Sequence, residues 1–314
     1  MRFSIGTGRA GSPVQWYLPG TDVARLPSPP DGAPPPVTGA LEDVATVGDG
    51  GGTLLGGLVG FSGDPGSDGQ GLVLDVLGAW NSVKNVSVLL DEAGRVTLAG
   101  FVHADVALGG GGDSSVVLYG AKRGNVLTGG GDDTVTIEAA SNVYAWVNEF
   151  RVATGGGGDT VVVRALDIAA AAAADATFAA TASDAGAFAG TDAASVVIAD
   201  LGAGDDTFVA LGESADRVSG GGGEDIIRAG RGADVLAGGA GNDLFLFVAG
   251  DGRDTILDFR PGADRLGFGL GAAEAEALLE AATEAEGATT ISYGEDAVVL
   301  VGVAKSQLNA NDLL

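Results

Sequence analysis

Three aspartates recur at every ninth position in the C-terminal third of the chain: Asp225, Asp234 and Asp243. A glycine stands two residues before each of them, and a large apolar residue stands two residues after, namely Ile227, Leu236 and Phe245. Carboxylates that a fold brings together are ligands for a hard cation. A fixed short period indicates structural units that stack on one another, so the fold must be one that aligns these acids.

Two nine-residue units make one eighteen-residue coil with a short strand on each side. Asp225 and Asp243 then lie on one edge of the stack, and Asp206 joins them after a one-residue insertion. Asp216 and Asp234 lie on the opposite edge. Glycine permits the positive φ of each turn and the close approach of coils, while the apolar residue after each acid points inward. We therefore predict an all-β fold, a parallel β-roll or β-helix.

Carboxylates stacked one strand spacing apart, about 4.8 Å, repel one another. The glycine turns add backbone carbonyl oxygens to the same groove, so each edge offers a row of oxygen ligands. Ca²⁺ takes roughly six to eight oxygens in flexible geometry and fits this row better than Mg²⁺ does. The predicted cofactor is Ca²⁺, and the predicted metal-site residues are Asp113, Asp133, Asp159, Asp206, Asp216, Gly221, Gly223, Asp225, Gly230, Gly232, Asp234, Gly239, Gly241, Asp243, Asp251 and Asp254.

Glycine-rich turns that end in an acid begin well before the regular repeats. The best-aligned acids, from Asp113 to Asp225, step by 20, 26, 47 and 19 residues. This spacing indicates a ragged array whose turns carry insertions, the largest being Ala-rich and covering about 165–199. An isolated Gly/Asp turn is also ordinary β-turn chemistry. At these upstream turns, a calcium site and a simple turn remain alternatives.

The composition excludes several classes of function. The chain of 314 residues has 42 acidic and 16 basic residues, a net charge of −26, and no cysteine. Such a charge disfavours binding to nucleic acid or to an anionic membrane and favours cations as partners. The hydrophobic fraction of 46 % indicates a folded chain. No apolar run reaches the roughly 18 residues that span a bilayer, so we expect no membrane insertion.

Three segments carry a family resemblance: "GGGGEDIIR", "GGAGNDLFL" and, more loosely, "AGRGADVLA". They resemble the G-G-x-G-x-D-x-U-x nonapeptide of hemolysin-type calcium-binding (RTX) proteins. The tail, with "DTILDF", "GADRLGF" and "VVLVGVAKSQLNANDLL", is similar to the segment and the uncleaved secretion signal that follow such repeats. The resemblance covers roughly 211–314. It implies a parallel β-roll, calcium ligands in the turns, and export by the type I secretion machinery.

The expected organisation has five parts. They are an N-terminal arm with a Pro-rich linker (1–40), an N-terminal β segment (41–107), a degenerate Gly/Asp-rich β-helical region (108–210), the RTX β-roll (211–262), and a C-terminal cap with the secretion signal (263–314). We predict that the cap contains a helix at "EAEALLEAATEAE", followed by two strands.

No catalytic motif stands out. His103 is the only histidine, which rules out an HExxH zinc site, and G-x-S-x-G does not occur. His103 lies in an alternating strand, where we expect a surface or satisfied residue. "IGTGRAG" matches G-x-G-x-x-G, but Pro13 and a Pro-rich run follow it where a dinucleotide site needs a helix. We therefore expect a protein that is not an enzyme.

The resulting hypothesis is a secreted, calcium-binding structural or adhesive protein that folds on Ca²⁺ outside the cell. It would act at the bacterial surface, in a surface layer, fibre or biofilm matrix, through self-assembly or contact with cell-surface polysaccharide. The alternative is a secreted polysaccharide-acting enzyme of lyase or epimerase type with an RTX export module. A clustered acid, Arg/Lys and Tyr set would favour that alternative. A calcium-loaded effector or toxin ranks last.

Overall fold

The computed structural model describes residues 93–99, 103–139, 148–165 and 195–313, together with five further strands: β1 (Phe3–Ile5), β2 (Ala45–Val47), β3 (Gly60–Ser62), β4 (Leu72–Asp75) and β5 (Asn85–Leu90). Apart from β1, the predicted arm at 1–40 lies outside the described residues, as does most of the Ala-rich stretch at 165–199. Strands β1 and β2 form an antiparallel pair. In the described parts of the chain, no helix is long and apolar enough to cross a membrane.

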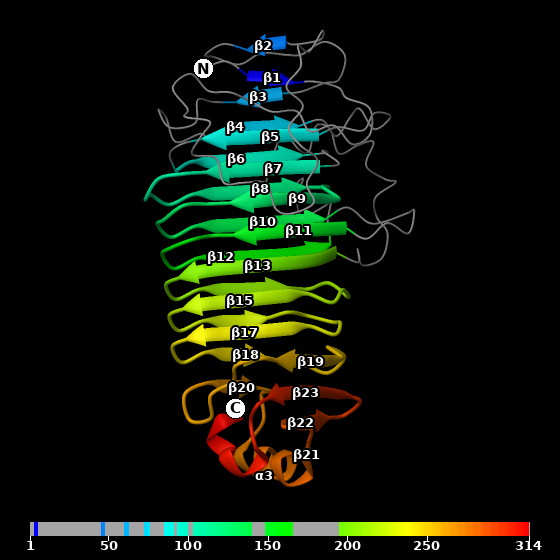
Figure 1. Ribbon diagram of the computed structural model, residues 1–314. Coiled ribbons are helices and arrows are strands. Elements are labelled where there is room, and N and C mark those ends of the chain that lie inside the picture. Colours follow the sequence, from blue (N-terminus) through cyan, green and yellow to red (C-terminus); the bar gives the residue numbers. More distant parts are fainter. Residues whose placement is uncertain are drawn as a thin grey trace.

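Successive strands alternate between two sheets, which we call the even sheet and the odd sheet after their strand numbers (Figure 1). After β4, the even sheet contains the parallel strands β6 (Arg95–Ala99), β8 (Ser115–Tyr119), β10 (Thr134–Ala139), β12 (Thr160–Ala165), β14 (Thr207–Ala210), β16 (Ile226–Arg228), β18 (Leu244–Leu246) and β20 (Arg265–Gly267). Strand β3 pairs with β4 in the antiparallel sense at the end of this sheet.

The odd sheet is built in the same way. After β5 it contains the parallel strands β7 (His103–Leu108), β9 (Arg123–Leu127), β11 (Asn148–Ala153), β13 (Ser195–Ala203), β15 (Arg217–Gly222), β17 (Val235–Ala240) and β19 (Arg253–Ile256). One odd strand and the next even strand form one coil, and the coils stack along a single axis (Figure 1). The predicted parallel β-roll is confirmed.

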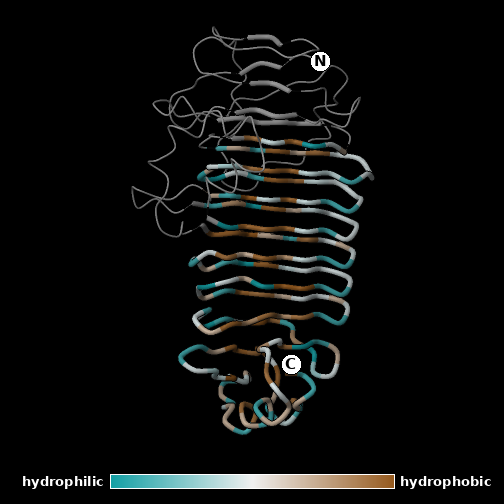
Figure 2. Tube along the Cα trace, turned by 180° about the vertical axis from the view of Figure 1, so that it is seen from behind, coloured by the Kyte–Doolittle hydropathy of each residue, from teal (hydrophilic) through white to brown (hydrophobic). Residues whose placement is uncertain are grey.

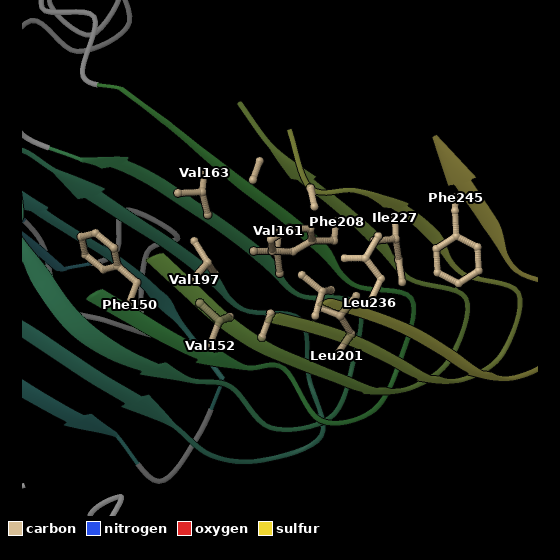
Figure 3. Packing of buried hydrophobic residues seen from close by; sticks show 14 of the residues in the cluster. Phe150, Val152, Val161, Val163, Val197, Leu201, Phe208, Ile227, Leu236 and Phe245 are labelled. Atoms are coloured by element: carbon tan, nitrogen blue, oxygen red, sulfur yellow. The ribbon is translucent and has the colours of Figure 1, made fainter. Parts of the chain in front are cut away.

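The hydrophobic core lies between the two sheets. Strand residues alternate between buried and partly exposed, as in the pattern of Thr207–Ala210, because successive side chains point to opposite faces of a sheet. The apolar residues that follow the repeated acids, Ile227, Leu236 and Phe245, are at most 1 % exposed. Figure 3 shows side chains of both sheets meeting in this interior, and Figure 2 shows polar residues gathered at the turns.

The register of the strands explains the irregular spacing of the upstream acids. Thr134 pairs with Thr160, and Thr160 pairs with Thr207, although 26 and 47 residues separate them. The extra residues lie at 140–147 and 166–194, and each of these segments joins an even strand to the next odd strand. The sheets run without a break across 107/108 and 210/211. The coils on both sides of each position share one architecture. The domain boundaries expected at 107/108 and 210/211 stay predictions.

The cap closes the C-terminal end of the roll. Helix α3 spans Ala272–Ala281, and its Ala275 is buried against the core. It is followed by β21 (Thr283–Ala285), β22 (Ala288–Tyr293) and β23 (Asp296–Val301), of which β23 adds in parallel to β19. The predicted helix is therefore too long. Its last residues form β21, because Glu286 and Gly287, with φ of 54° and 76°, make a two-residue hairpin turn into β22.

Candidate metal centre

The turns of the roll form two edges. We call the edge where an odd strand leads into the next even strand the long edge, and the edge where an even strand leads into the next odd strand the short edge. Each edge carries a row of buried aspartates. We call these rows the long-edge column and the short-edge column. The long-edge column contains Asp133, Asp159, Asp206, Asp225, Asp243 and Asp264, and the short-edge column contains Asp216, Asp234 and Asp254.

A hydrogen-bond ladder holds the long-edge column together. Oδ1 of each aspartate accepts from the backbone N–H at the equivalent position of the preceding coil. The distances, from Asp133 to Asp264, are 2.6, 2.8, 2.7, 2.9, 3.1 and 3.2 Å. The donor is the preceding aspartate at every step but the first, where it is Ser114. The column is thus continuous through the region where the nine-residue frame is lost from the sequence.

The short-edge column follows the same rule over fewer coils. Oδ1 of Asp216, Asp234 and Asp254 accepts from the backbone N–H of Val197, Asp216 and Asp234, at 2.8, 2.7 and 3.0 Å respectively. The sequence placed Asp225 and Asp243 on one edge and Asp216 and Asp234 on the other, and the structure does the same.

In six of these carboxylates the second oxygen accepts no hydrogen bond. Oδ2 is buried and accepts no hydrogen bond at Asp133, Asp159, Asp206, Asp225, Asp234 and Asp243. A buried acceptor without a partner is costly, and a buried unpaired charge is costlier still. Six such oxygens in register indicate that the protein alone does not complete the hydrogen bonding and charge balance of its two edges.

Burial raises the pKa values of column aspartates on both edges, among them Asp206, Asp216 and Asp234. Desolvation, reinforced by the neighbouring carboxylates of Asp216 and Asp254, raises the pKa of Asp234 to about 8. Desolvation raises the pKa of Asp216 to about 7, and desolvation with the charges of Asp159 and Asp225 raises that of Asp206 to about 7. Two effects therefore oppose ionisation, namely loss of water and repulsion between coils. A bound cation would offset both effects, because its positive charge stabilises the ionised carboxylates.

Glycine is required where successive coils meet. At Gly241, φ is 137°, and a Cβ there would lie 1.6 Å from the carbonyl oxygen of Gly223 in the preceding coil. A Cβ on Gly239 would lie 2.0 Å from the carbonyl oxygen of Gly221. No other residue fits these positions, and the glycine carbonyls are directed at the following coil. Positive φ values occur at every glycine of the predicted site: Gly221, Gly223, Gly230, Gly232, Gly239 and Gly241.

These groups fit a calcium ion that takes oxygens from both side chains and backbone. Among the described residues, no three His, Cys, Asp or Glu side chains converge on one point. A cation at either edge must therefore draw most of its ligands from backbone carbonyls, which Ca²⁺ accepts readily. On the long edge, Asp225 and Asp243 with the carbonyls of the glycine turns would hold it. The ion would supply the positive charge that the buried carboxylates lack.

Two of the predicted metal-site aspartates lie outside the columns. In the coil of β7 and β8 the column position is occupied by Ser114, so Asp113 is exposed, and its Oδ1 accepts from the backbone N–H of Asp132 at 2.9 Å. Asp251 is buried, but its Oδ2 accepts from the backbone N–H of Val248 at 2.8 Å within its own turn. The short-edge position in that coil belongs to Asp254.

Sequence reasoning missed three residues at the C-terminal end of the long edge. Asp264 ends the column, and its signal was present, because a glycine precedes it by two and Leu266 follows it by two. The carboxylate of Asp258 accepts from the backbone N–H groups of Gly238 and Gly239 at 3.0 and 2.9 Å. Arg260 lies between these acids, and the nonapeptide pattern holds no signal for it.

His103 is the first residue of β7 in the odd sheet, at the end of that strand next to the short edge. Its Nε2 is 2.9 Å from Oδ1 of Asp105. The same oxygen accepts from the backbone N–H and from Nδ2 of Asn125, at 3.1 and 2.6 Å. The ring is part-buried in a local hydrogen-bond network, and the described contacts include no serine or other nucleophile beside it.

Comparison with known proteins bears on the ion. Residues 211–245 match the family model of the RTX calcium-binding nonapeptide repeat, in four copies. No curated protein matches the chain. Among solved structures, the chain is similar to an extracellular lipase, LipA from Serratia marcescens, with 16 % sequence identity and a TM-score of 0.26. The likeness covers 77 % of this chain and 42 % of the lipase, so the chain spans less than half of that protein. Residues 211–245 are RTX calcium-binding repeats, and Ca²⁺ is their ion.

Proposed function

We propose that this chain is exported unfolded and that its roll folds outside the cell when calcium occupies the two edges. One observation carries the proposal: buried Oδ2 atoms that accept no hydrogen bond recur along the long-edge column from Asp133 to Asp243, and another, that of Asp234, lies on the short edge. Without a cation these groups oppose folding, since each is desolvated and lies next to a like charge. With calcium bound, the same groups become ligands that join neighbouring coils.

The affinities of extracellular calcium sites are of the right size for such a switch. For a Kd on the order of 10⁻⁴ M, millimolar calcium stabilises the folded state by roughly 1.4 kcal/mol per site. Several sites together contribute a large share of a net stability of about 5–15 kcal/mol. At the much lower calcium concentration of a bacterial cytoplasm, the same sites contribute almost nothing. The chain would therefore remain unfolded, and competent for export, until it leaves the cell.

Circular dichroism in EGTA and then in millimolar Ca²⁺ tests the switch directly. We expect weak β signal in EGTA and a strong β spectrum after calcium is added, with Mg²⁺ at the same concentration as the matched control. A spectrum that calcium leaves unchanged would contradict the proposal. A spectrum restored equally by Mg²⁺ would show that only screening of the −26 net charge matters.

For export, the proposal assigns the C-terminal segment to a type I secretion system. The support is the RTX repeats at 211–245 and the resemblance of "VVLVGVAKSQLNANDLL" to a secretion signal. Expression beside a type I apparatus, with and without residues 298–314, tests this assignment. The intact chain should appear in the medium and the truncated chain should remain in the cells. Equal export of both would contradict it.

Outside the cell, we propose a structural or adhesive role at the bacterial surface. The support is the elongated stack of coils (Figure 1) and the exposure of large apolar side chains, among them Leu211, Val248 and Leu257, each 47–48 % exposed. Size-exclusion chromatography and electron microscopy with and without Ca²⁺ test this role. Calcium-dependent filaments or sheets would support it, and a calcium-loaded monomer that does not bind cells would contradict it.

One observation favours the enzyme alternative. Tyr119, Glu138 and Arg164 occupy the same register position on β8, β10 and β12. Glu138 is 2 % exposed, and its Oε1 accepts from Nε of Arg164 at 3.0 Å. This is an acid, Arg and Tyr set on one sheet, of the kind that a lyase or epimerase acting on acidic sugars would need. Release of unsaturated products from an acidic glycan by the calcium-loaded protein, lost in Arg164→Ala, would support catalysis.

A further inference from the structure

The last position of the long-edge column differs from the others. Both oxygens of Asp264 have partners: Oδ1 accepts from the backbone N–H of Asp243 at 3.2 Å and from Nη2 of Arg260 at 3.1 Å. Oδ2 accepts from the backbone N–H of Arg260 at 2.7 Å. In the coils before it, Oδ2 of Asp206 and Asp225 has no partner. The distinguishing element is therefore Arg260.

The guanidinium of Arg260 lies between the last two turns of the long edge. Its Nη2 donates to the carbonyl oxygen of Gly241 and lies 3.6 Å from Oδ2 of Asp243. It thus contacts two successive column aspartates and a glycine carbonyl. These are the same groups that the earlier coils present to the space between them.

The neighbouring charges fix Arg260 in the charged state. A guanidinium keeps its proton at any pH a protein tolerates, and its bond with Asp264, together with the charges of Asp243 and Asp258, raises the pKa of Arg260 further. Among the ion pairs of the described residues, those of Arg260 alone include a column aspartate. Arg231, on the short edge, donates instead to Oε1 of Glu213 at 3.0 Å.

We infer that Arg260 is a built-in cation that takes the place of Ca²⁺ between the turns of Asp243 and Asp264. The C-terminal end of the long edge is then complete without metal. This inference rests on the proposed calcium-driven folding and adds that the last position of the long edge needs no metal ion.

Calcium titration of Arg260→Gln tests the assignment. Glutamine keeps a hydrogen-bonding side chain but removes the charge, so the position becomes available to a metal ion. At saturation, Arg260→Gln should bind one more Ca²⁺ per chain than the unmodified protein, as measured by isothermal titration calorimetry. The calcium concentration at the folding midpoint should rise only about two- to threefold, because the stabilisation lost with the charged contact is made up by the binding of several calcium ions. Unchanged stoichiometry with an unchanged midpoint would overturn the inference, and so would a lower midpoint.

Two variants serve as matched controls. Arg260→Lys keeps a positive charge and should retain the stoichiometry of the unmodified protein. Arg231→Gln removes an equivalent charge from a turn whose guanidinium does not contact a column aspartate, and it should alter neither quantity. An extra calcium ion in Arg231→Gln as well would overturn the inference, because any lost charge would then have the same effect.

Hydrogen exchange of the unmodified protein in EGTA gives a test that needs no variant. The backbone N–H of Asp243 donates to Asp264, and that of Asp206 donates to Asp225 by the same geometry. Peptides containing Asp243 should exchange at least tenfold more slowly than peptides containing Asp206, and calcium should remove most of the difference. Equal rates in EGTA would overturn the inference. If the unmodified protein bound no calcium at all, the proposed function would fail instead, so the two failures are distinguishable.

Discussion

The backbone N–H of Asp206 donates to Oδ1 of Asp225 at 2.9 Å, while Oδ2 of Asp225 is buried and accepts no hydrogen bond. The two oxygens of one carboxylate thus have different tasks. Oδ1 sets the spacing between coils through the protein's own hydrogen bonds. Oδ2 is left for a cation. This division means that the edge can have the right geometry in the absence of metal and still be energetically unfavourable there.

Asp225→Asn separates these two tasks. The amide oxygen of asparagine can still accept from the backbone N–H of Asp206, but the charged ligand is lost. We expect the loss of unfolding free energy to be at least about 1 kcal/mol larger in millimolar calcium than in EGTA. Urea titrations in both buffers measure this difference. Asp113→Asn, at an exposed acid outside the column, is the control. Equal losses for Asp225→Asn in the two buffers would contradict a calcium role at this position.

The pH dependence of the metal-free roll follows from the raised pKa values. The unfolded chain has aspartate pKa values of about 3.9, whereas those of Asp225, Asp206 and Asp234 in the roll are about 6, 7 and 8. Between these limits the folded state binds more protons than the unfolded state, so folding becomes less favourable as pH rises. The stability is present below about pH 4 and is lost as pH rises through 6 to 8, the folded pKa values.

Circular dichroism in EGTA across that pH range checks the prediction. The β signal should be stronger at pH 5 than at pH 8 without metal, and calcium should flatten the profile because it holds the carboxylates ionised. Metal-free stability that increases with pH over this window would show that the carboxylates are not desolvated as the structure indicates.

Gly241→Ala should disrupt the stacking of two coils. The added Cβ would lie 1.6 Å from the carbonyl oxygen of Gly223, and φ at this position is 137°. We expect a loss of about 3 kcal/mol or more in calcium, from backbone strain and steric overlap together. Gly222→Ala is a close control, since no atom lies within 4 Å of a Cβ there. It should cost no more than about 0.5 kcal/mol. Similar losses in both variants would contradict the packing of the turns.

The ion pair on the even sheet gives a fourth prediction. Arg164→Ala leaves Glu138, which is 2 % exposed, without its partner. We expect a loss of about 3 kcal/mol at neutral pH, because an uncompensated buried carboxylate remains. Arg151→Ala removes a comparable but exposed pair with Glu149 and should cost less than about 1 kcal/mol. Chemical denaturation measures these losses, and equal losses in the two variants would contradict the assignment.

The sequence predicted the repeated part of the fold well. The period of nine placed Asp225 and Asp243 on one edge and Ile227 in the interior, because each repeat has the same local geometry. The spacing did not predict that Asp133 and Asp159 continue the column in register, since the separation of 26 residues includes the segment 140–147 between β10 and β11. Strand pairing restores the register, and pairing is a property of the folded chain.

Side chains that act across coils were harder to predict. Asp113 and Ser114 are adjacent, and only the stacking of the coils shows that Ser114 holds the column position. Arg260 belongs to no repeat pattern, and its role depends on contacts with Gly241 and Asp243, about one coil earlier. The end of α3 was missed because the hairpin at Glu286 and Gly287 competes with helix propensity, and pairing of β21 with β22 decides the outcome.

The segments at 140–147 and 166–194 both join an even strand to the next odd strand. The two long insertions therefore lie on the short edge, and the long edge keeps its aspartates in register. Such an architecture can acquire new inserted segments without altering the long-edge column. Foreign peptides grafted at 140–147 should be displayed with the metal array intact, whereas the same graft between Gly239 and Asp243 would divide the array in two.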